Sequence, residues 1–151
     1  MKAINKILLI LLFIGSTAFI QQDTPPDVLA CVEESGPAAV YLRDFRVELP
    51  AAKPGEKTPM FRKAMVLRGN NLYRFNFCNA KGEAVIRIYD SSNMMLTSYD
   101  PSKSKYYNPV QFLCRKTGPY NIVITFKDGE AGEAIGIMSH VKISESRRSA
   151  R

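Results

Sequence analysis

The chain has 151 residues, and its hydrophobic content of 46% is enough to close one core without a metal or a dense disulfide framework. Its formal net charge is +7, but Lys and Arg are scattered singly rather than clustered on one element, which argues against a nucleic-acid-binding protein. We therefore expect a single domain with no nucleic-acid partner.

Residues 1–18 have the layout of a secretory signal peptide, with Lys2 and Lys6 ahead of an apolar run. The small residues Ser16 and Ala18 favour cleavage after Ala18. The alternative is a membrane anchor, but the apolar run is shorter than the roughly 20 residues that a spanning helix needs. Cleavage would leave 19 basic and 14 acidic residues, a formal charge of +5. We expect an exported protein, periplasmic or extracellular, with no transmembrane segment in the mature chain.

The segment 19–37 should contain one short helix, over Val28–Ser35. Thr24 or Asp27 would cap its start, and the Gly-Pro pair that follows Ser35 would end it. No other helix is predicted.

The segment 38–144 is predicted to be an antiparallel β-sandwich, because the apolar period changes there from 3.6 to 2 and turn residues recur at short intervals. About seven or eight strands of this kind favour an all-β, jelly-roll-like fold. A slip in the alternation near Asp44 indicates a bulge or bend. The last residues, 145–151, should be a basic disordered tail. The strands are expected at Val40–Leu49, Phe61–Leu67, Leu72–Cys78, Ala84–Asp90, Met94–Tyr99, Pro109–Cys114, Tyr120–Phe126 and Ala134–Ile143.

Two of these strands carry a clear apolar face, and we expect the two faces to meet in one core. They consist of Tyr73, Phe75 and Phe77 in one strand and Tyr120, Ile122, Ile124 and Phe126 in the other.

Three cysteines remain after cleavage, and an oxidising compartment favours a bond between two of them, with three pairings open. Cys78 and Cys114 each end a strand directly before a turn, so we predict a Cys78–Cys114 disulfide that closes a loop of 37 residues. The alternative is that both thiols stay reduced. Cys31 is then a buried free thiol on the helix. Lipidation at Cys31 is a further alternative, but polar and proline residues separate this cysteine from the apolar run, unlike in a lipobox.

Two stretches carry a resemblance to known families: Tyr73-x-Phe75-x-Phe77-x-Asn79-Ala80-x-Gly82-Glu83-Ala84-x-Ile86-x-Ile88-Tyr89-Asp90 and Phe112-Leu113-Cys114-x-x-Thr117-Gly118-x-Tyr120-x-Ile122-x-Ile124. Over about residues 60–143 the chain resembles the small jelly-roll sandwiches typified by the bacterial pre-peptidase C-terminal (PPC) domain and by GOLD domains. It is also similar to an uncharacterised family of exported proteins of Gram-negative bacteria. The resemblance implies a non-enzymatic accessory or binding module. The acidic clusters that hold calcium in some pre-peptidase domains have no match here, so it implies no metal.

Residue types suited to catalysis are sparse. His140 is the only histidine, and its place in an alternating strand favours a half-exposed structural residue over a general base. The sequence has no Gly-x-Ser-x-Gly motif, and one histidine with three separated cysteines is a poor zinc site. We therefore predict no enzymatic activity, no metal and no cofactor. A hydrolase would instead need His140 in a cleft beside a carboxylate and a hydroxyl.

The segment between the strands that end at Tyr99 and begin at Pro109 is the strongest candidate binding site in the sequence. Tyrosine rings can stack on sugar faces, and neighbouring amines can hold an anionic polymer. The alternative is that Tyr99 and one of the later tyrosines only close the end of the sandwich. The candidate ligand-binding residues are Tyr99, Lys103, Lys105, Tyr106 and Tyr107.

Together these features predict an exported, non-catalytic β-sandwich module that binds a protein or another component of the cell envelope or exterior. The alternative is a glycan-binding module that uses Tyr99, Tyr106 and Tyr107.

Overall fold

The computed structural model describes residues 25–91 and 93–142. The predicted signal peptide, 1–18, and the predicted basic tail, 145–151, lie outside the described residues.

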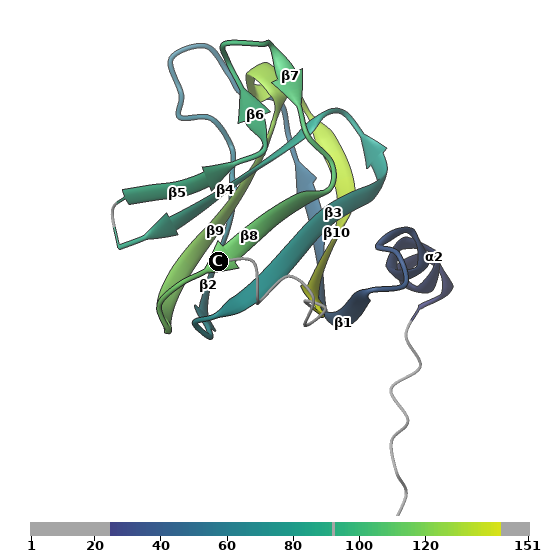
Figure 1. The fold of residues 1–151 in the computed structure, drawn as a ribbon. Helices are drawn as coiled ribbons and strands as arrows, with labels where there is room; N and C mark the ends of the chain where they lie inside the picture. Colours follow the sequence, from purple (N-terminus) through teal and green to yellow (C-terminus); the bar gives the residue numbers. More distant parts are fainter. Residues whose placement is uncertain (1–24, 92, 143–151) are drawn as a thin grey trace, which may run out of the picture.

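Two four-stranded antiparallel sheets form the body of the molecule (Figure 1). Sheet A contains, in spatial order, β1 (Ala39–Leu49), β10 (Gly132–Val141), β3 (Asn71–Lys81) and β8 (Val110–Cys114). Sheet B contains β2 (Phe61–Leu67), β9 (Gly118–Phe126), β4 (Ala84–Asp90) and β5 (Asn93–Thr97). Numbered in chain order, the eight strands run 1-8-3-6 in one sheet and 2-7-4-5 in the other, which is the order of a jelly roll. The predicted antiparallel, jelly-roll-like sandwich is therefore confirmed.

The core lies between the two sheets and is built from alternate side chains of their strands. The two predicted apolar faces, on β3 and β9, belong to one buried cluster, as expected. Within it the rings of Phe112 and Tyr120 pack edge to face, with their centroids 5.5 Å apart. Because each fully buried side chain of this size contributes about 1.5–3 kcal/mol, these inner faces account for much of the stability of the fold.

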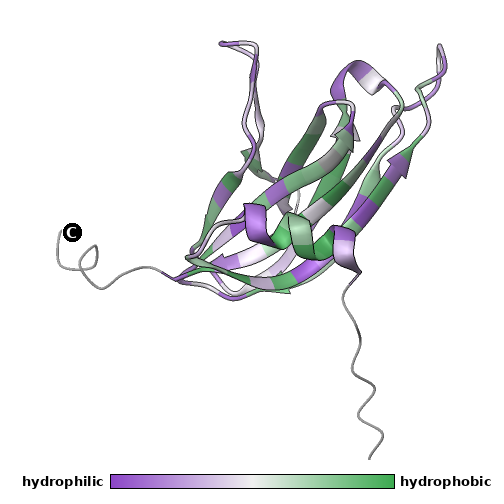
Figure 2. Ribbon diagram, turned by 90° about the vertical axis from the view of Figure 1, so that its right-hand side faces the viewer, coloured by the Kyte–Doolittle hydropathy of each residue, from purple (hydrophilic) through white to green (hydrophobic). Residues whose placement is uncertain are grey.

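The single α-helix of the described residues is α2 (Pro26–Glu34), which begins two residues before the predicted start. Proline is tolerated in a first helical turn, where its missing N–H would have no partner. Asp27 does not occupy the N-cap position, but its carboxylate accepts a hydrogen bond from the Val28 N–H at 3.0 Å. The helix crosses the outer face of sheet A (Figure 2), where Val28 and Cys31 pack with Ile135 and Ile137 of β10.

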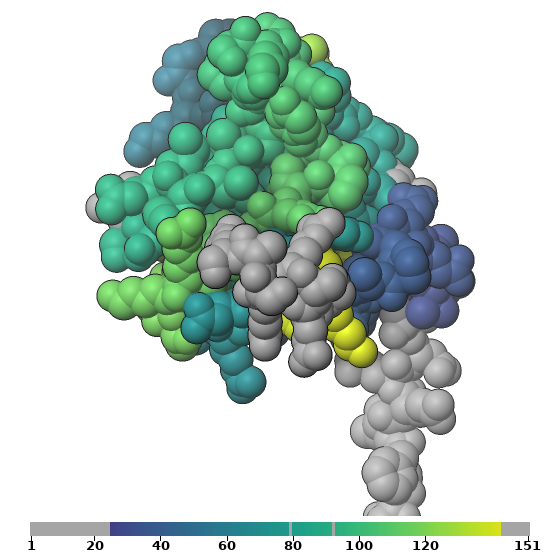
Figure 3. Space-filling model, viewed as in Figure 1, coloured from purple at the N-terminus to yellow at the C-terminus, as the bar shows by residue number. Residues whose placement is uncertain are grey.

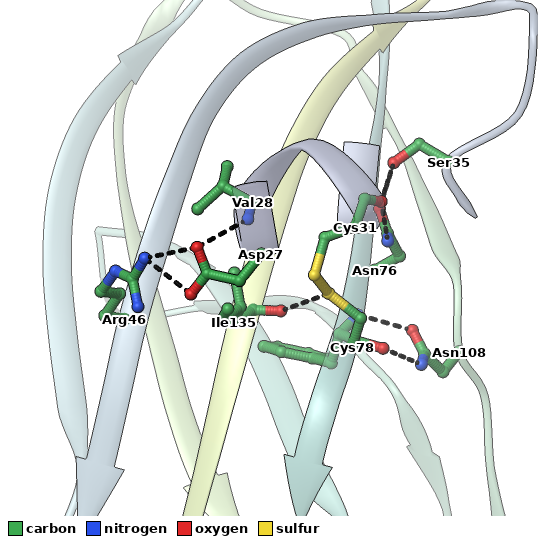
Figure 4. Close-up of a disulfide and its surroundings, with 10 residues drawn as sticks. Asp27, Val28, Cys31, Ser35, Arg46, Asn76, Cys78, Asn108 and Ile135 are labelled. Carbon is green, nitrogen blue, oxygen red and sulfur yellow. Dashed lines mark hydrogen bonds and ion pairs between the residues drawn. A yellow bond between two sulfur atoms is a disulfide. The ribbon is translucent and has the colours of Figure 1, made fainter. Parts of the chain in front are cut away.

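A disulfide joins Cys31 of α2 to Cys78 of β3, with the two Cα atoms 5.7 Å apart (Figure 4). The predicted Cys78–Cys114 pairing is therefore wrong, and so is the prediction that Cys31 is the free thiol. Cys114 is the free cysteine, and it is buried. The expectation that one disulfide staples this domain through Cys78 is confirmed.

The direction of the side chains explains this pairing. Cys114 is in phase with Phe112 on β8, so it points into the core between the sheets. Cys78 is in phase with Asn76 on β3, so it points to the outer face of sheet A, under the helix. The two thiols therefore lie on opposite faces of the same sheet.

Polar contacts fix α2 to sheet A (Figure 4). The Ser35 hydroxyl donates to the Asn76 side-chain oxygen at 2.6 Å, and the Asn76 amide donates to the Cys31 carbonyl at 3.3 Å. Arg74 donates to the Ser35 carbonyl, which satisfies another acceptor at the helix end. The helix is therefore a fixed layer over β10 and β3 on one outer face of the sandwich.

Two local features of the strands differ from the expected pattern. The predicted irregularity near Asp44 is present slightly earlier, as a register shift between Tyr41 and Arg43 against β10. The predicted strand Met94–Tyr99 is divided at Ser98, whose buried hydroxyl accepts a hydrogen bond from the Ile86 N–H at 3.0 Å. The Ser98 hydroxyl therefore replaces the backbone carbonyl that would accept this hydrogen bond in a continuous strand. The chain then leaves sheet B and enters a two-stranded ribbon, β6 (Tyr99–Asp100) and β7 (Lys105–Tyr106).

Candidate functional site

The two outer faces of the sandwich differ. On sheet A, α2 packs over β10 and β3. It is the only α-helix in residues 25–91 and 93–142, so no helix of this part of the chain lies on sheet B. The outer face of sheet B instead carries a groove of about 780 Å³. The strands β2, β9 and β4 place side chains in this groove.

The strand register places one arginine on each side of the central strand β9. Arg62 of β2 lies opposite Val123, and Val123 lies opposite Arg87 of β4. Because neighbouring strands are about 4.8 Å apart, the Cα atoms of the two arginines are about 10 Å apart. Both side chains alternate with residues of the core, so both point to the outer face.

The two guanidinium groups lean toward the same end of the groove. The Arg87 Nη1 donates to the Thr125 Oγ1 at 3.0 Å, and the Arg62 Nη2 lies 4.0 Å from the Met60 Sδ. Since Phe61 pairs with Ile124, Met60 and Thr125 occupy the next level along the sheet. Within the described residues, neither arginine forms an ion pair with a carboxylate.

The floor of the groove is nearly closed to solvent. Val123 and Thr125 point outward from β9, yet only 5% and 7% of their surfaces are exposed. Arg62, Arg87 and Tyr89 of the neighbouring strands line the same groove, and the Arg87 guanidinium contacts the Thr125 hydroxyl. The remaining lining residues are Thr58, Met60, Ser91, Asn121, Phe126, Asp128 and Gly129.

One end of the groove is formed by the 3-10 turn η1 (Lys127–Gly129) and by the loop 50–60 between β1 and β2. The Ala52 N–H donates to the Gly129 carbonyl at 2.7 Å, which holds the loop against the turn. Asp128 adopts a left-handed backbone, with φ at 50°, and it is a groove-lining residue. Among the described residues, two positive charges, Arg62 and Arg87, and one negative charge, Asp128, line the groove and give it a formal net charge of +1.

The five residues predicted to bind a ligand lie together on the ribbon, which forms the upper end of the molecule in Figures 1 and 3. The Tyr99 and Tyr106 rings stack on each other, with centroids 4.6 Å apart and an interplanar angle of 28°. The Lys127 Nζ lies 5.5 Å from the centroid of the Tyr106 ring. Burial is the main cause that raises the pKa of Tyr106 above its ordinary value. One face of the Tyr99 ring and one face of the Tyr106 ring are therefore already covered by each other and are closed to a ligand.

The other predicted ligand residues are more open. The Lys103 Nζ pairs with an Asp100 carboxylate oxygen at 3.6 Å. The Lys105 Nζ lies 5.1 Å from the centroid of the Tyr107 ring, and Tyr107 is 38% exposed. Lys103, Lys105 and Tyr107 are thus exposed, whereas Tyr99 and Tyr106 are half-buried.

The groove was not predicted, although part of its signal is in the sequence. The alternation within Phe61–Leu67 and Ala84–Asp90 already puts Arg62, Arg87 and Tyr89 on the polar phase of their strands. The sequence does not reveal that β2 and β4 both pair with the same central strand, β9. From the sequence alone, Arg62 and Arg87 are therefore interpreted as two separate solvent-exposed side chains.

Other features of the chain lie away from the groove. His140 is half-buried on sheet A, where its ring lies edge to face with Tyr73 at a centroid distance of 6.4 Å. Across the part of the chain that the structure describes, no three His, Cys, Asp or Glu residues gather closely enough to hold a metal ion. The described residues also contain no helix with the length and apolar character needed to cross a membrane.

The fold and the groove define a jelly-roll β-sandwich with one outer face covered by a disulfide-linked helix and the other open. No protein-family model matches the chain, and no curated protein matches it. The resemblance to pre-peptidase C-terminal and GOLD domains therefore stays a prediction.

Proposed function

We propose that the chain is an exported, non-catalytic β-sandwich module that binds a component of the cell envelope or exterior, with the groove on sheet B as its binding face. The observation that carries this proposal is the pair Arg62 and Arg87, two guanidinium groups that line one groove without a carboxylate partner among the described residues. Guanidinium groups form their strongest hydrogen bonds with anions. The partner should therefore present negative charge.

Export is supported by the Cys31–Cys78 bond, because disulfides of this structural kind persist in oxidising compartments and are rare in reducing ones. The choice between periplasm and exterior does not affect the binding proposal.

A binding role rather than catalysis is supported by the groove lining. Asp128 is its only carboxylate, and the only histidine of the chain, His140, packs against Tyr73 on the other sheet. General acid–base catalysis needs a proton donor or acceptor within hydrogen-bonding reach of the reacting group, commonly with a second group that orients it. Hydroxyl, amide and guanidinium groups are better suited to holding a ligand in place.

Cross-linking followed by affinity purification tests this function. The bait is the full chain as wild type, as the groove variant Arg62→Ala/Arg87→Ala, and as the control variant Lys63→Ala/Lys142→Ala. The control removes the same charge from exposed positions that do not line the groove. We expect one component to be recovered with the wild type and the control and lost with the groove variant. The proposal would be contradicted if no component were recovered, or if every recovered component were found equally with all three baits.

A second candidate function is glycan binding by the ribbon, which the exposure of Tyr107 beside Lys105 favours. A glycan array compares the wild type with the variant Tyr99→Ala/Tyr106→Ala/Tyr107→Ala. Loss of a specific signal in the variant would support this candidate, and identical signals from both proteins would dismiss it.

A further inference from the structure

We propose that the groove on sheet B binds an acidic saccharide, with a sugar carboxylate held between the guanidinium groups of Arg62 and Arg87. This inference rests on the proposed binding function and names the chemical class of the ligand. It follows from the geometry of the two arginines, the charge of the groove, and the polar character of its lining.

The geometry suits one carboxylate shared by two arginines. Arg62 and Arg87 flank Val123 at the same level of the sheet, and their guanidinium groups lean in the same direction, toward Met60 and Thr125. Each guanidinium presents a planar fork of N–H donors that matches the two oxygens of a carboxylate. An anion above Thr125 could therefore accept hydrogen bonds from both sides of β9.

The charge balance favours a singly charged group between the two arginines over a doubly charged one. Arg62, Arg87 and Asp128 give the groove a formal charge of +1, which a carboxylate between the arginines neutralises. A phosphate monoester concentrates about −1.5 to −2 on one group at neutral pH, so Asp128 would repel it more strongly than one carboxylate of an oligosaccharide, whose other carboxylates lie on separate sugar rings. Asp128 can instead accept hydrogen bonds from neutral hydroxyl groups.

The rest of the lining suits a ligand that carries many hydroxyl groups. The volume of about 780 Å³ falls within the range of roughly 300–1,000 Å³ that small-molecule sites occupy. Tyr89 offers an apolar ring with a polar tip, the combination that fits the face and edge of a sugar ring. A peptide would need apolar pockets for anchoring side chains, whereas eight of the twelve residues that line this groove carry a polar side-chain group. The polar partners available to a saccharide are Thr58, Ser91 and Asn121.

Calorimetric titration tests the inference with the purified protein and trigalacturonate as the acidic probe. Its methyl ester supplies a matched probe without the negative charge. We expect the wild type and the control variant Lys63→Ala/Lys142→Ala to bind trigalacturonate with similar affinity. The wild type should bind the methyl ester at least about tenfold more weakly than it binds trigalacturonate. The variant Arg62→Ala/Arg87→Ala should show at least the same loss of affinity for trigalacturonate.

A second variant, Arg62→Lys/Arg87→Lys, keeps both charges and removes the planar forks. It should bind trigalacturonate more weakly than the wild type but more tightly than the alanine variant. Circular dichroism checks that each variant is folded. If the alanine variant is unfolded, the comparison between the wild type and the lysine variant tests the inference.

Several outcomes would overturn the inference. Equal affinity for trigalacturonate and its methyl ester would show that the carboxylate is not recognised. Tighter binding of a sulfated trisaccharide would reject the carboxylate as the recognised group, and tighter binding of a glutamate-rich peptide would reject the saccharide. Absence of trigalacturonate binding, combined with recovery of a groove-dependent component in the cross-linking experiment, would reject the saccharide and leave the proposed binding function standing. Failure of both experiments would reject both.

Discussion

Cys31 and Cys78 covalently join the helix α2 to β3, the third strand of sheet A, and their Cα atoms lie 5.7 Å apart. The bond spans a sequence separation of 47 residues, for which loop-closure entropy predicts a stabilisation of up to about 4 kcal/mol. It also keeps α2 over the apolar outer residues Ile135 and Ile137.

We therefore predict that Cys31→Ala/Cys78→Ala lowers the free energy of unfolding by a few kcal/mol, up to about 4 kcal/mol, in denaturant titration. Cys114→Ala is the matched control, because it keeps the disulfide and should cost only about 1 kcal/mol for the small cavity left in the core. Non-reducing peptide mapping should recover Cys31 linked to Cys78. Recovery of Cys78 linked to Cys114 would contradict the structure.

The correct pairing could have been predicted from the alternation of the strands. Cys114 follows Val110 and Phe112 at every second position, so it shares their core phase, whereas Cys78 follows Asn76 on the polar phase. Two cysteines in opposite phases of paired strands point away from each other. Their positions at strand ends suggested proximity, but the phase of the side chains decides which thiols can meet.

The fold was more predictable than the site, because strand alternation depends on neighbouring residues while the groove depends on distant ones. The strands Phe61–Leu67 and Ala84–Asp90 have the predicted boundaries. Arg62 and Arg87 come together only because both strands pair with β9, which follows much later in the chain. Hydrophobic periodicity specifies which face a residue takes and carries no information about which strands are neighbours.

Tyr120 should make the protein less stable at high pH. A side-chain hydrogen bond with Cys114, followed by burial, raises the pKa of Tyr120 to about 12 from its ordinary value of 10.0. The folded state therefore holds this proton more tightly than the unfolded state. The stabilisation is complete below pH 10.0 and is lost as the pH rises toward 12.

Denaturant titrations at about pH 9 and about pH 11.5 measure this effect in the wild type and in Tyr120→Phe. We expect the wild type to lose more stability than the variant between the two pH values. The comparison is needed because other groups also titrate there: the pKa values of Tyr41 and Tyr106 are raised too, chiefly by burial. An equal loss in both proteins would exclude Tyr120 as a cause.

Gly132 should be intolerant of a side chain, in contrast with Gly118. A Cβ atom at Gly132 would overlap the buried ring of Phe126, whereas a Cβ at Gly118 would meet no atom within 4 Å. Gly132→Ala should therefore cost about 1–3 kcal/mol through displacement of a core ring. Gly118→Ala should change stability by less than about 1 kcal/mol. Thermal unfolding of both variants checks this, and similar melting temperatures would contradict the packing of Phe126 against β10.

The stacked rings of Tyr99 and Tyr106 should stabilise the ribbon. A double-mutant cycle with Tyr99→Leu and Tyr106→Leu should give a coupling free energy of about 0.5–1.5 kcal/mol in denaturant titration. Lys127→Ala is a useful third variant, since the Lys127 Nζ lies 5.5 Å from the Tyr106 ring centroid and removing it leaves the stacked pair in place. A coupling energy near zero would mean that the two rings do not pack on each other in solution.

Thr125 should act on ligand binding through Arg87 rather than by itself. Its Oγ1 accepts a hydrogen bond from the Arg87 Nη1 at 3.0 Å, which directs the guanidinium over the floor of the groove. Thr125→Val keeps the shape of the side chain and removes this acceptor, so the guanidinium should lose its fixed position and the affinity for trigalacturonate should fall about threefold to tenfold. In an Arg87→Ala background the same change should have almost no effect, because there is no guanidinium left to orient. Equal losses of affinity in the two backgrounds would instead mean that Thr125 contacts the saccharide independently of Arg87.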